Sequence, residues 1–179
     1  MNASATAFAA FRDLVEMICE DNVSVTESAS GWARDVEIVA SATDVKRLVG
    51  DRAQTFRGLA GVLRGIGIGT GVSYNLMPVV ARKGTVAREF EPFAEQAEWP
   101  RERIGKAVET VLHAAFPGAV QSVQHYNNSS GSEQCFTFEV RLTTPLKRPA
   151  EIFVEALDRV LRLVGIRQGR MLHAKLVLV

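Results

Sequence analysis

Residues 43–64 of this chain read TDVKRLVGDRAQTFRGLAGVLR, and this stretch decides the fold. Its first part is a short amphipathic segment whose apolar residues are Val45, Leu48 and Val49. Gly50 ends that segment, and two charged residues follow it. The second part has the spacing of one buried helical face, with apolar residues at Phe56, Leu59, Ala60, Leu63 and Ile66. The stretch therefore predicts two helices joined by a short break at Gly50.

The composition is typical of a soluble globular protein. The chain has 179 residues, 47% of them hydrophobic, and a mean hydropathy of +0.06, which is too apolar for disorder. This length suits two compact domains. No apolar run approaches the roughly 18 residues of a membrane span, and the first residues lack the pattern of a secretory signal. Cys19 and Cys135 are far apart in the sequence, with no CxxC and no metal-binding spacing, which favours reduced thiols. We therefore expect a cytoplasmic protein, and we expect no membrane contact.

The net charge is only +1, but the basic residues are concentrated in one strip of the sequence. Between residues 46 and 64 the only acidic residue is Asp51, and the basic residues are Lys46, Arg47, Arg52, Arg57 and Arg64. A strip of this size suits a short phosphate contact better than it suits a broad polyanion surface. An ordinary solvated helix face is the competing interpretation.

Apolar periodicity predicts the other elements of the first half. A helix is expected over residues 8–18, strands over 23–26 and 36–39, and a closing strand over 72–80. Together with the broken helix pair, the order is α-β-β-α-α-β. The glycine-rich segment 65–71 (GIGIGTG) follows a predicted helix and precedes a strand, the reverse of a dinucleotide-binding turn. We expect it to be a flexible helix-to-strand loop.

The second half follows a similar order. A helix is expected over residues 104–115, strands over 120–126 and 135–142, a long helix over 152–164 and a closing strand over 171–179. A shift of 98 positions places Leu63 on Leu161 and Leu14 on Leu112. The sequence thus predicts an α+β fold with a tandem repeat, in which 1–82 and 101–179 are domains. Residues 83–100 form the linker, and its aromatic residues Phe90, Phe93 and Trp99 favour packing against a domain.

The first half resembles a KH domain of the prokaryotic, type II arrangement, and in detail the small bacterial KH-domain RNA-binding proteins. FRDLVEMI at residues 11–18 is similar to the opening helix of that family, and DVKRLVGDRAQTFRGLAGVLR at 44–64 to its GxxG block. The resemblance covers about residues 7–80 and rests on element order alone for 101–179. It implies two tandem KH-like α-β-β-α-α-β modules, each a three-stranded sheet with helices on one face.

The resemblance also implies a function and a site. KH domains hold about four unpaired nucleotides beside the GxxG loop, whose backbone lies against phosphates. The expected partner is therefore single-stranded RNA, in a setting such as RNA folding, ribosome assembly or small-RNA handling. The residues expected at the site are Val45, Lys46, Leu48, Val49, Gly50, Asp51, Arg52, Ala53 and Arg57. Of these, Val45, Leu48 and Val49, with Ile38 or Val39, would form the apolar wall under the bases.

Two residues of the loop depart from the family pattern. Ala53 adds a methyl group where the family has glycine and where the backbone must approach a phosphate. Asp51 stands where a basic residue is common, and with Gln54 three residues on it resembles a capping box. We therefore expect Asp51 to cap the following helix and to weaken phosphate binding. The second copy has Arg148–Glu151 in place of the loop, with no glycine.

The competing function is a KH-derived protein-interaction or scaffold module that has lost RNA, and a homodimer through the closing strands is a further alternative. We expect no catalysis, because no nucleophile motif or pair of carboxylates stands out. No cofactor is expected. No metal site is expected either, since His113, His125 and His173 are too far apart in the sequence for a metal-binding spacing.

Overall fold

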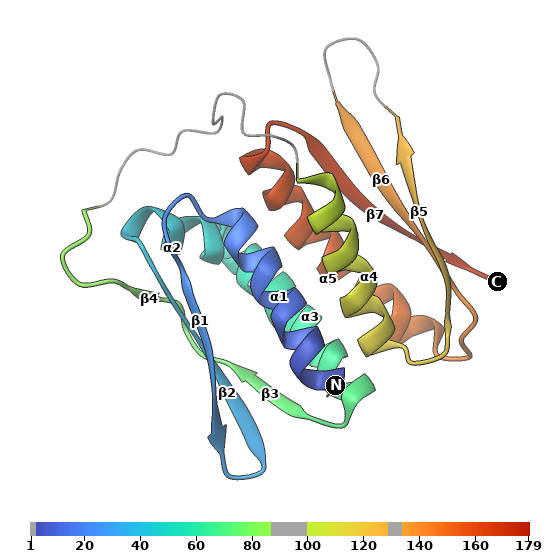
Figure 1. Cartoon of the computed structure of the whole chain (residues 1–179), viewed down its shortest axis with the longest axis horizontal. Helices are drawn as coiled ribbons and strands as arrows, with labels where there is room; N and C mark the ends of the chain where they lie inside the picture. Colours follow the sequence, from blue (N-terminus) through green and yellow to red (C-terminus); the bar gives the residue numbers. More distant parts are fainter. Residues whose placement is uncertain (1–2, 87–99, 129–133) are drawn as a thin grey trace.

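The computed structural model describes residues 3–86, 100–128 and 134–179 (Figure 1). In the first half the elements are α1 (Ala3–Ile18), β1 (Ser24–Ser30), β2 (Ala33–Ala40), α2 (Ala42–Val49), α3 (Gln54–Thr70), β3 (Ser73–Leu76) and β4 (Val80–Ala81). In the second half they are α4 (Arg101–Ala115), β5 (Val120–Asn127), β6 (Cys135–Leu142), α5 (Lys147–Arg167) and β7 (Met171–Leu178). The protein has an α+β fold with two mixed sheets.

The first sheet has the strand order β1-β2-β3. β1 runs antiparallel to β2, and β3 runs parallel to β2 with Ala33 opposite Ser73. β4 continues along the same edge of β2, with Val39 opposite Val80. The expected single closing strand over residues 72–80 is therefore wrong, because it is interrupted around Pro78. Proline has no N–H to donate to the sheet, which explains the interruption.

The second sheet repeats this arrangement, with β5 antiparallel to β6 and β7 parallel to β6. The expected α-β-β-α-α-β order is observed in the first half, whereas the second half has the order α-β-β-α-β. For the second half the prediction of a helix pair is thus wrong. Residues 147–164 contain no glycine, and α5 runs unbroken for 21 residues. Pro149 lies in its first turn, where a missing N–H breaks no helical hydrogen bond.

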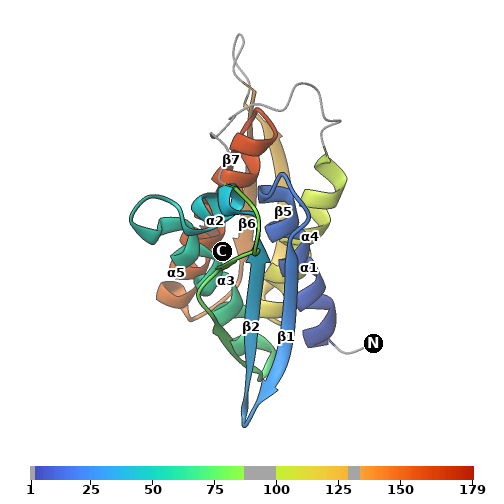
Figure 2. The ribbon, with the colours of Figure 1, turned by 90° about the vertical axis from the view of Figure 1, so that its left-hand side faces the viewer.

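The helices of the two halves pack against each other, and the two sheets lie outside them (Figures 1 and 2). α1 contacts α4, and α3 contacts both α4 and α5. A single hydrophobic core runs through this helical layer and takes in residues of both halves, among them Phe11, Leu14, Leu63, Leu112 and Leu161. The chain is therefore a layered β-α-α-β structure. The expected linker aromatics Phe90, Phe93 and Trp99 lie outside the described residues.

Glycines on α3 allow the helices to approach closely. A Cβ built on Gly65 would lie 2.1 Å from a ring carbon of Phe153 on α5, and one built on Gly69 would lie 1.9 Å from the carbonyl oxygen of Ala114 on α4. The expectation that residues 65–71 form a flexible loop is wrong, because α3 extends to Thr70. Packing against the second half overrides the low helix propensity of glycine here.

His125 on β5 makes stability depend on pH. Its ring lies edge-on to Phe138 with centroids 4.7 Å apart, and its Nε2 is buried with no hydrogen-bond partner among the described residues. Burial lowers the pKa of His125 below the ordinary 6.5, Arg101 lowers it further and Glu109 opposes the change. The unfolded chain therefore takes up this proton at a higher pH than the folded protein.

We expect the free energy of unfolding to be highest above about pH 6.5 and to fall as the pH drops through the pKa of folded His125. Urea unfolding at about pH 7.5 and about pH 5 measures the difference, and His125→Phe should reduce it. His113→Phe, at an exposed position of α4, is the control. An unchanged pH dependence in His125→Phe would contradict this assignment.

Candidate functional site

The candidate site is the loop Gly50–Ala53 between α2 and α3, called here the Gly50 loop. Gly50 ends α2 with φ 70° and ψ 174°, and its N–H donates to the carbonyl of Lys46 at 2.9 Å. A Cβ on Gly50 would lie 2.2 Å from Oγ1 of Thr55, so this position requires glycine. Asp51–Ala53 form a single 3-10 turn before α3 begins. The predicted helix break at Gly50 is confirmed.

Two consecutive residues of the loop adopt the left-handed conformation although neither is glycine. Arg52 has φ 49° and ψ 33°, and Ala53 has φ 59° and ψ 27°. The Cβ atom makes this conformation costly, by about 1 to 2 kcal/mol per residue. Ala53 thus adopts the backbone geometry that glycine would adopt without strain. KH domains, which the first half resembles, have glycine at this position.

Ala53→Gly should stabilise the protein. Removing the methyl group relieves the left-handed strain, and the greater freedom of glycine in the unfolded chain offsets part of the gain, so we expect about 1 kcal/mol. Urea unfolding gives the value. The matched control is Ala60→Gly within α3, which should destabilise by about 1 kcal/mol. A loss of stability in both variants would show that the conformation of Ala53 carries no strain.

The helix start after the loop has no side-chain cap. The N-cap residue of α3 is Ala53, and no side-chain hydrogen bond caps it. The expectation that Asp51 caps this helix is therefore wrong. The left-handed turn at Arg52 and Ala53 separates Asp51 from the first turn of the helix. Uncapped amides at a helix start favour an anion, because their N–H groups and the helix dipole point at it.

The expected site residues differ in how accessible they are. Lys46, Asp51, Arg52 and Arg57 are exposed, and Val45, Val49, Gly50 and Ala53 are partly buried. Leu48 and Ile38 are fully buried, so neither can contact a ligand in this structure. The expected apolar wall is thus reduced to Val45, Val49 and Val39, which is also partly buried. β4 lies beside α2 and adds Val80, which is 45% exposed and was not among the expected site residues.

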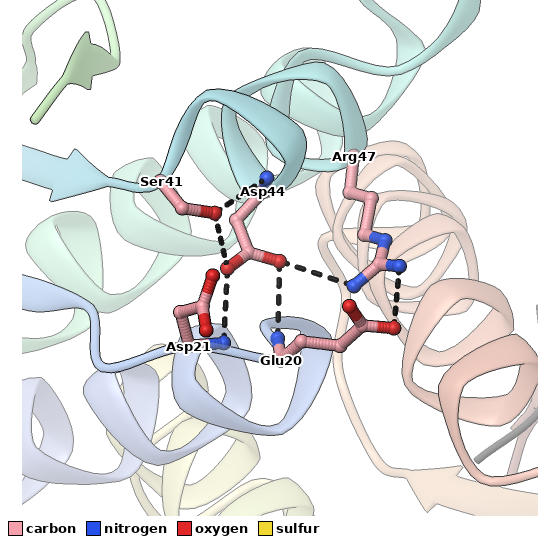
Figure 3. Close-up of polar contacts among 5 residues, drawn as sticks. All are labelled: Glu20, Asp21, Ser41, Asp44 and Arg47. Atoms are coloured by element: carbon pink, nitrogen blue, oxygen red, sulfur yellow. Dashed lines mark hydrogen bonds and ion pairs between the residues drawn. The ribbon is translucent and has the colours of Figure 1, made fainter. Parts of the chain in front are cut away.

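Arg47 is an internal residue and no part of the basic strip. Its Nη2 donates to Oε1 of Glu20 at 2.7 Å, and its Nη1 to Oδ1 of Asp44 at 3.1 Å (Figure 3). The expectation that Arg47 lies with the exposed basic residues is wrong, because these carboxylates hold it at 5% exposure. The surface charge of the strip comes from Lys46, Arg52, Arg57 and Arg64.

Asp44 is the centre of this buried network and is fully buried itself. It accepts hydrogen bonds from the amides of Glu20 and Asp21 at 3.0 and 3.1 Å and from the hydroxyl of Ser41 at 2.9 Å (Figure 3). Glu20 and Asp21 follow α1, whereas Asp44 and Arg47 lie on α2. The network therefore fixes α2, and with it the Gly50 loop, against the end of α1.

The sequence carries a local signal for this network, although Asp44 was not among the expected functional residues. Ser41 is the N-cap of α2, and its hydroxyl accepts from the amide of Asp44 at 3.1 Å. Ser-x-x-Asp before an apolar helix is a capping-box pattern. This pattern predicts an N-terminal role for Asp44, but it does not predict the contact with Arg47.

A pocket of about 390 Å³ joins the Gly50 loop to the second half. The first half lines it with Gly50, Asp51, Gln54 and Thr55, and α5 lines it with Glu155, Asp158, Arg159, Arg162 and Leu163. The α5 residues were not expected at the site, because the two halves were expected to be separate domains. The counterpart segment 148–151 is helical and forms no second loop of this kind.

Comparison with models of known protein families gives no match, and a search of curated proteins gives none either.

Among the described residues, no helix has both the length and the apolar character that crossing a bilayer requires. No cluster of three or more His, Cys, Asp or Glu side chains that could hold a metal ion occurs in residues 3–86, 100–128 and 134–179.

Proposed function

We propose that this protein binds single-stranded RNA through the Gly50 loop without catalysing a reaction, in the cytoplasm, and that its halves are tandem KH-like modules. The observation that carries the proposal is the loop itself: a glycine with positive φ, a left-handed turn and the uncapped start of α3. The amides of Gly50, Ala53 and Gln54 already donate to the carbonyls of Lys46, Gly50 and Asp51. The attraction for a phosphate therefore comes from the helix dipole at the start of α3. The mixed strand order that both sheets share supports the tandem arrangement.

The side chains around the loop supply the remaining contacts. Lys46, Arg52 and Arg57 are exposed and would attract phosphates, whereas Asp51 opposes them. Val45 and Val49 would pack against bases. With three cations near one loop, we expect a short contact and a moderate affinity that falls steeply with salt.

A second candidate function is protein binding, and one observation favours it. Trp32 follows β1 at the β1–β2 turn and is 89% exposed. Exposed tryptophan is unusual on a protein surface and is enriched at protein interfaces. An apolar interface of this kind would show little dependence on salt.

Arg52→Glu tests the RNA proposal. Reversing this charge beside a phosphate should weaken binding of an unstructured RNA by at least about tenfold, which corresponds to about 1.4 kcal/mol. Fluorescence anisotropy of a labelled RNA of about ten nucleotides, at about 50 mM and about 200 mM salt, measures the affinity. Lys175→Glu on β7 makes the same change in net charge and is the control. Equal losses in the two variants would argue against a contact at Arg52, and absence of binding by the wild type would reject the proposal.

A further inference from the structure

The pocket between the Gly50 loop and α5 brings a second set of polar groups to the loop. Gln54 and Thr55 come from the start of α3, and Arg159 and Arg162 come from the facing side of α5. The side chain of Arg162 is 60% exposed and that of Arg159 is 40% exposed. Both guanidinium groups are therefore accessible to a ligand.

Ion pairs hold these guanidinium groups in place. Nε of Arg162 donates to Oδ2 of Asp158 at 2.8 Å, and Arg159 pairs with Glu155. Oδ1 of Asp158 in turn accepts from the backbone amide of Ala174 on β7 at 2.9 Å. Arg162 is thus oriented by a carboxylate that the second sheet anchors, which makes its guanidinium a preorganised planar surface.

A nucleobase suits this lining better than a phosphate does. Both arginines are already paired with carboxylates, and Asp51 adds another negative charge, so a phosphate would meet repulsion. A base is neutral and planar, and unstacked RNA bases stack on guanidinium planes. The volume of about 390 Å³ also lies within the range of roughly 300–1,000 Å³ for small-ligand pockets.

We propose that this pocket holds one unstacked base of the RNA strand whose phosphate contacts the Gly50 loop, with the base stacked on Arg162. This inference rests on the proposed function and extends the site into the second half. Asp51 provides an acceptor for an exocyclic amino group, as carboxylates do for N4 of cytosine. Uracil carries a carbonyl at that position and would face the carboxylate unfavourably. The pocket therefore prefers cytosine to uracil.

The test compares labelled oligocytidylate and oligouridylate of about ten nucleotides in anisotropy titrations. Wild type should bind the cytosine oligomer about tenfold more tightly, which is the discrimination that one good polar pair provides. Arg162→Ala should lose about tenfold in affinity, and Arg162→Lys should lose nearly as much, because lysine keeps the charge but not the plane. Arg141→Ala is the matched control, since Arg141 is an ion-paired arginine of β6 outside the pocket. Circular dichroism of each variant checks that it is folded.

The outcomes separate this inference from the proposed function. Loss of binding in Arg52→Glu with wild-type affinity in both Arg162 variants would overturn the base pocket and leave the RNA proposal standing. Full rescue by Arg162→Lys would indicate a phosphate contact and overturn the stacking. Displacement of the RNA by free cytidine monophosphate at equal concentration would assign the pocket to free nucleotides and also overturn it. If wild type binds neither oligomer, both proposals fall.

Discussion

Asp44→Ala is expected to destabilise the protein by about 3 to 5 kcal/mol, the typical loss when one partner of a buried ion pair is removed. Arg47 is now paired with the carboxylates of Asp44 and Glu20, and the change removes the first of these two. It also removes the oxygen atoms that accept from the amides of Glu20 and Asp21. Urea unfolding followed by circular dichroism measures the loss.

Further variants separate the contribution of the buried charge to stability from that of the helix cap. In Asp44→Ala combined with Arg47→Met, no buried charge is left unpaired, so we expect it to recover part of the lost stability. Ser41→Ala removes the N-cap of α2 and the hydroxyl that donates to Asp44, but no charge, and should cost about 1 to 2 kcal/mol. A loss below about 1 kcal/mol in Asp44→Ala would mean that the network does not hold α2 in place.

Gly69→Ala is expected to destabilise the protein by about 2 to 3 kcal/mol, although alanine is the better helix former by about 1 kcal/mol. The added Cβ would lie 1.9 Å from the carbonyl oxygen of Ala114 and 2.7 Å from that of Ala115, and backbone atoms cannot rotate away. α3 and α4 would have to separate, which opens the core shared by the two halves. Urea unfolding again gives the value.

Gly58→Ala is the control for this effect. Its Cβ would lie 3.1 Å from the carbonyl oxygen of Ala156, a tight contact that a small shift can relieve. The gain in helix propensity and the cost of that shift should nearly cancel. If Gly69→Ala instead proves more stable than the wild type, the close packing of α3 on α4 is wrong.

The local structure of the first half could be predicted because its signals are local. Gly50 interrupts the apolar period of residues 45–66, and the structure has its helix break there. Alternating apolar residues likewise indicated the strands on either side of the hairpins. Pro78 was visible in the sequence as well, and the rule that proline interrupts a strand would have predicted the split between β3 and β4.

The packing between the halves could not be predicted in this way. Gly65 and Gly69 indicate flexibility when they are considered alone, and they become helical only because Phe153 and Ala114 lie against them. Those contacts join residues about 45 to 90 positions apart, which no local pattern encodes. The same reason explains why the contribution of Arg159 and Arg162 to the pocket was not predicted.

The candidate site was predicted in part. Charge counting placed Arg47 on the surface, whereas its two carboxylate partners bury it. The apolar period did not distinguish Leu48, which is fully buried, from Val45 and Val49, which keep some exposed surface. Periodicity identifies the face of a helix that turns inward, but the depth of each residue depends on the elements packed over it.

The measurement that tests the central claim most directly is an NMR titration of the ¹⁵N-labelled protein with an unstructured RNA of about ten nucleotides. It records the change in chemical shift of each backbone amide. If the Gly50 loop binds phosphate, the largest shifts should occur at Gly50, Arg52, Ala53 and the first residues of α3, and they should be lost in Arg52→Glu. Shifts that gather around Trp32 and leave the loop unchanged would contradict the account.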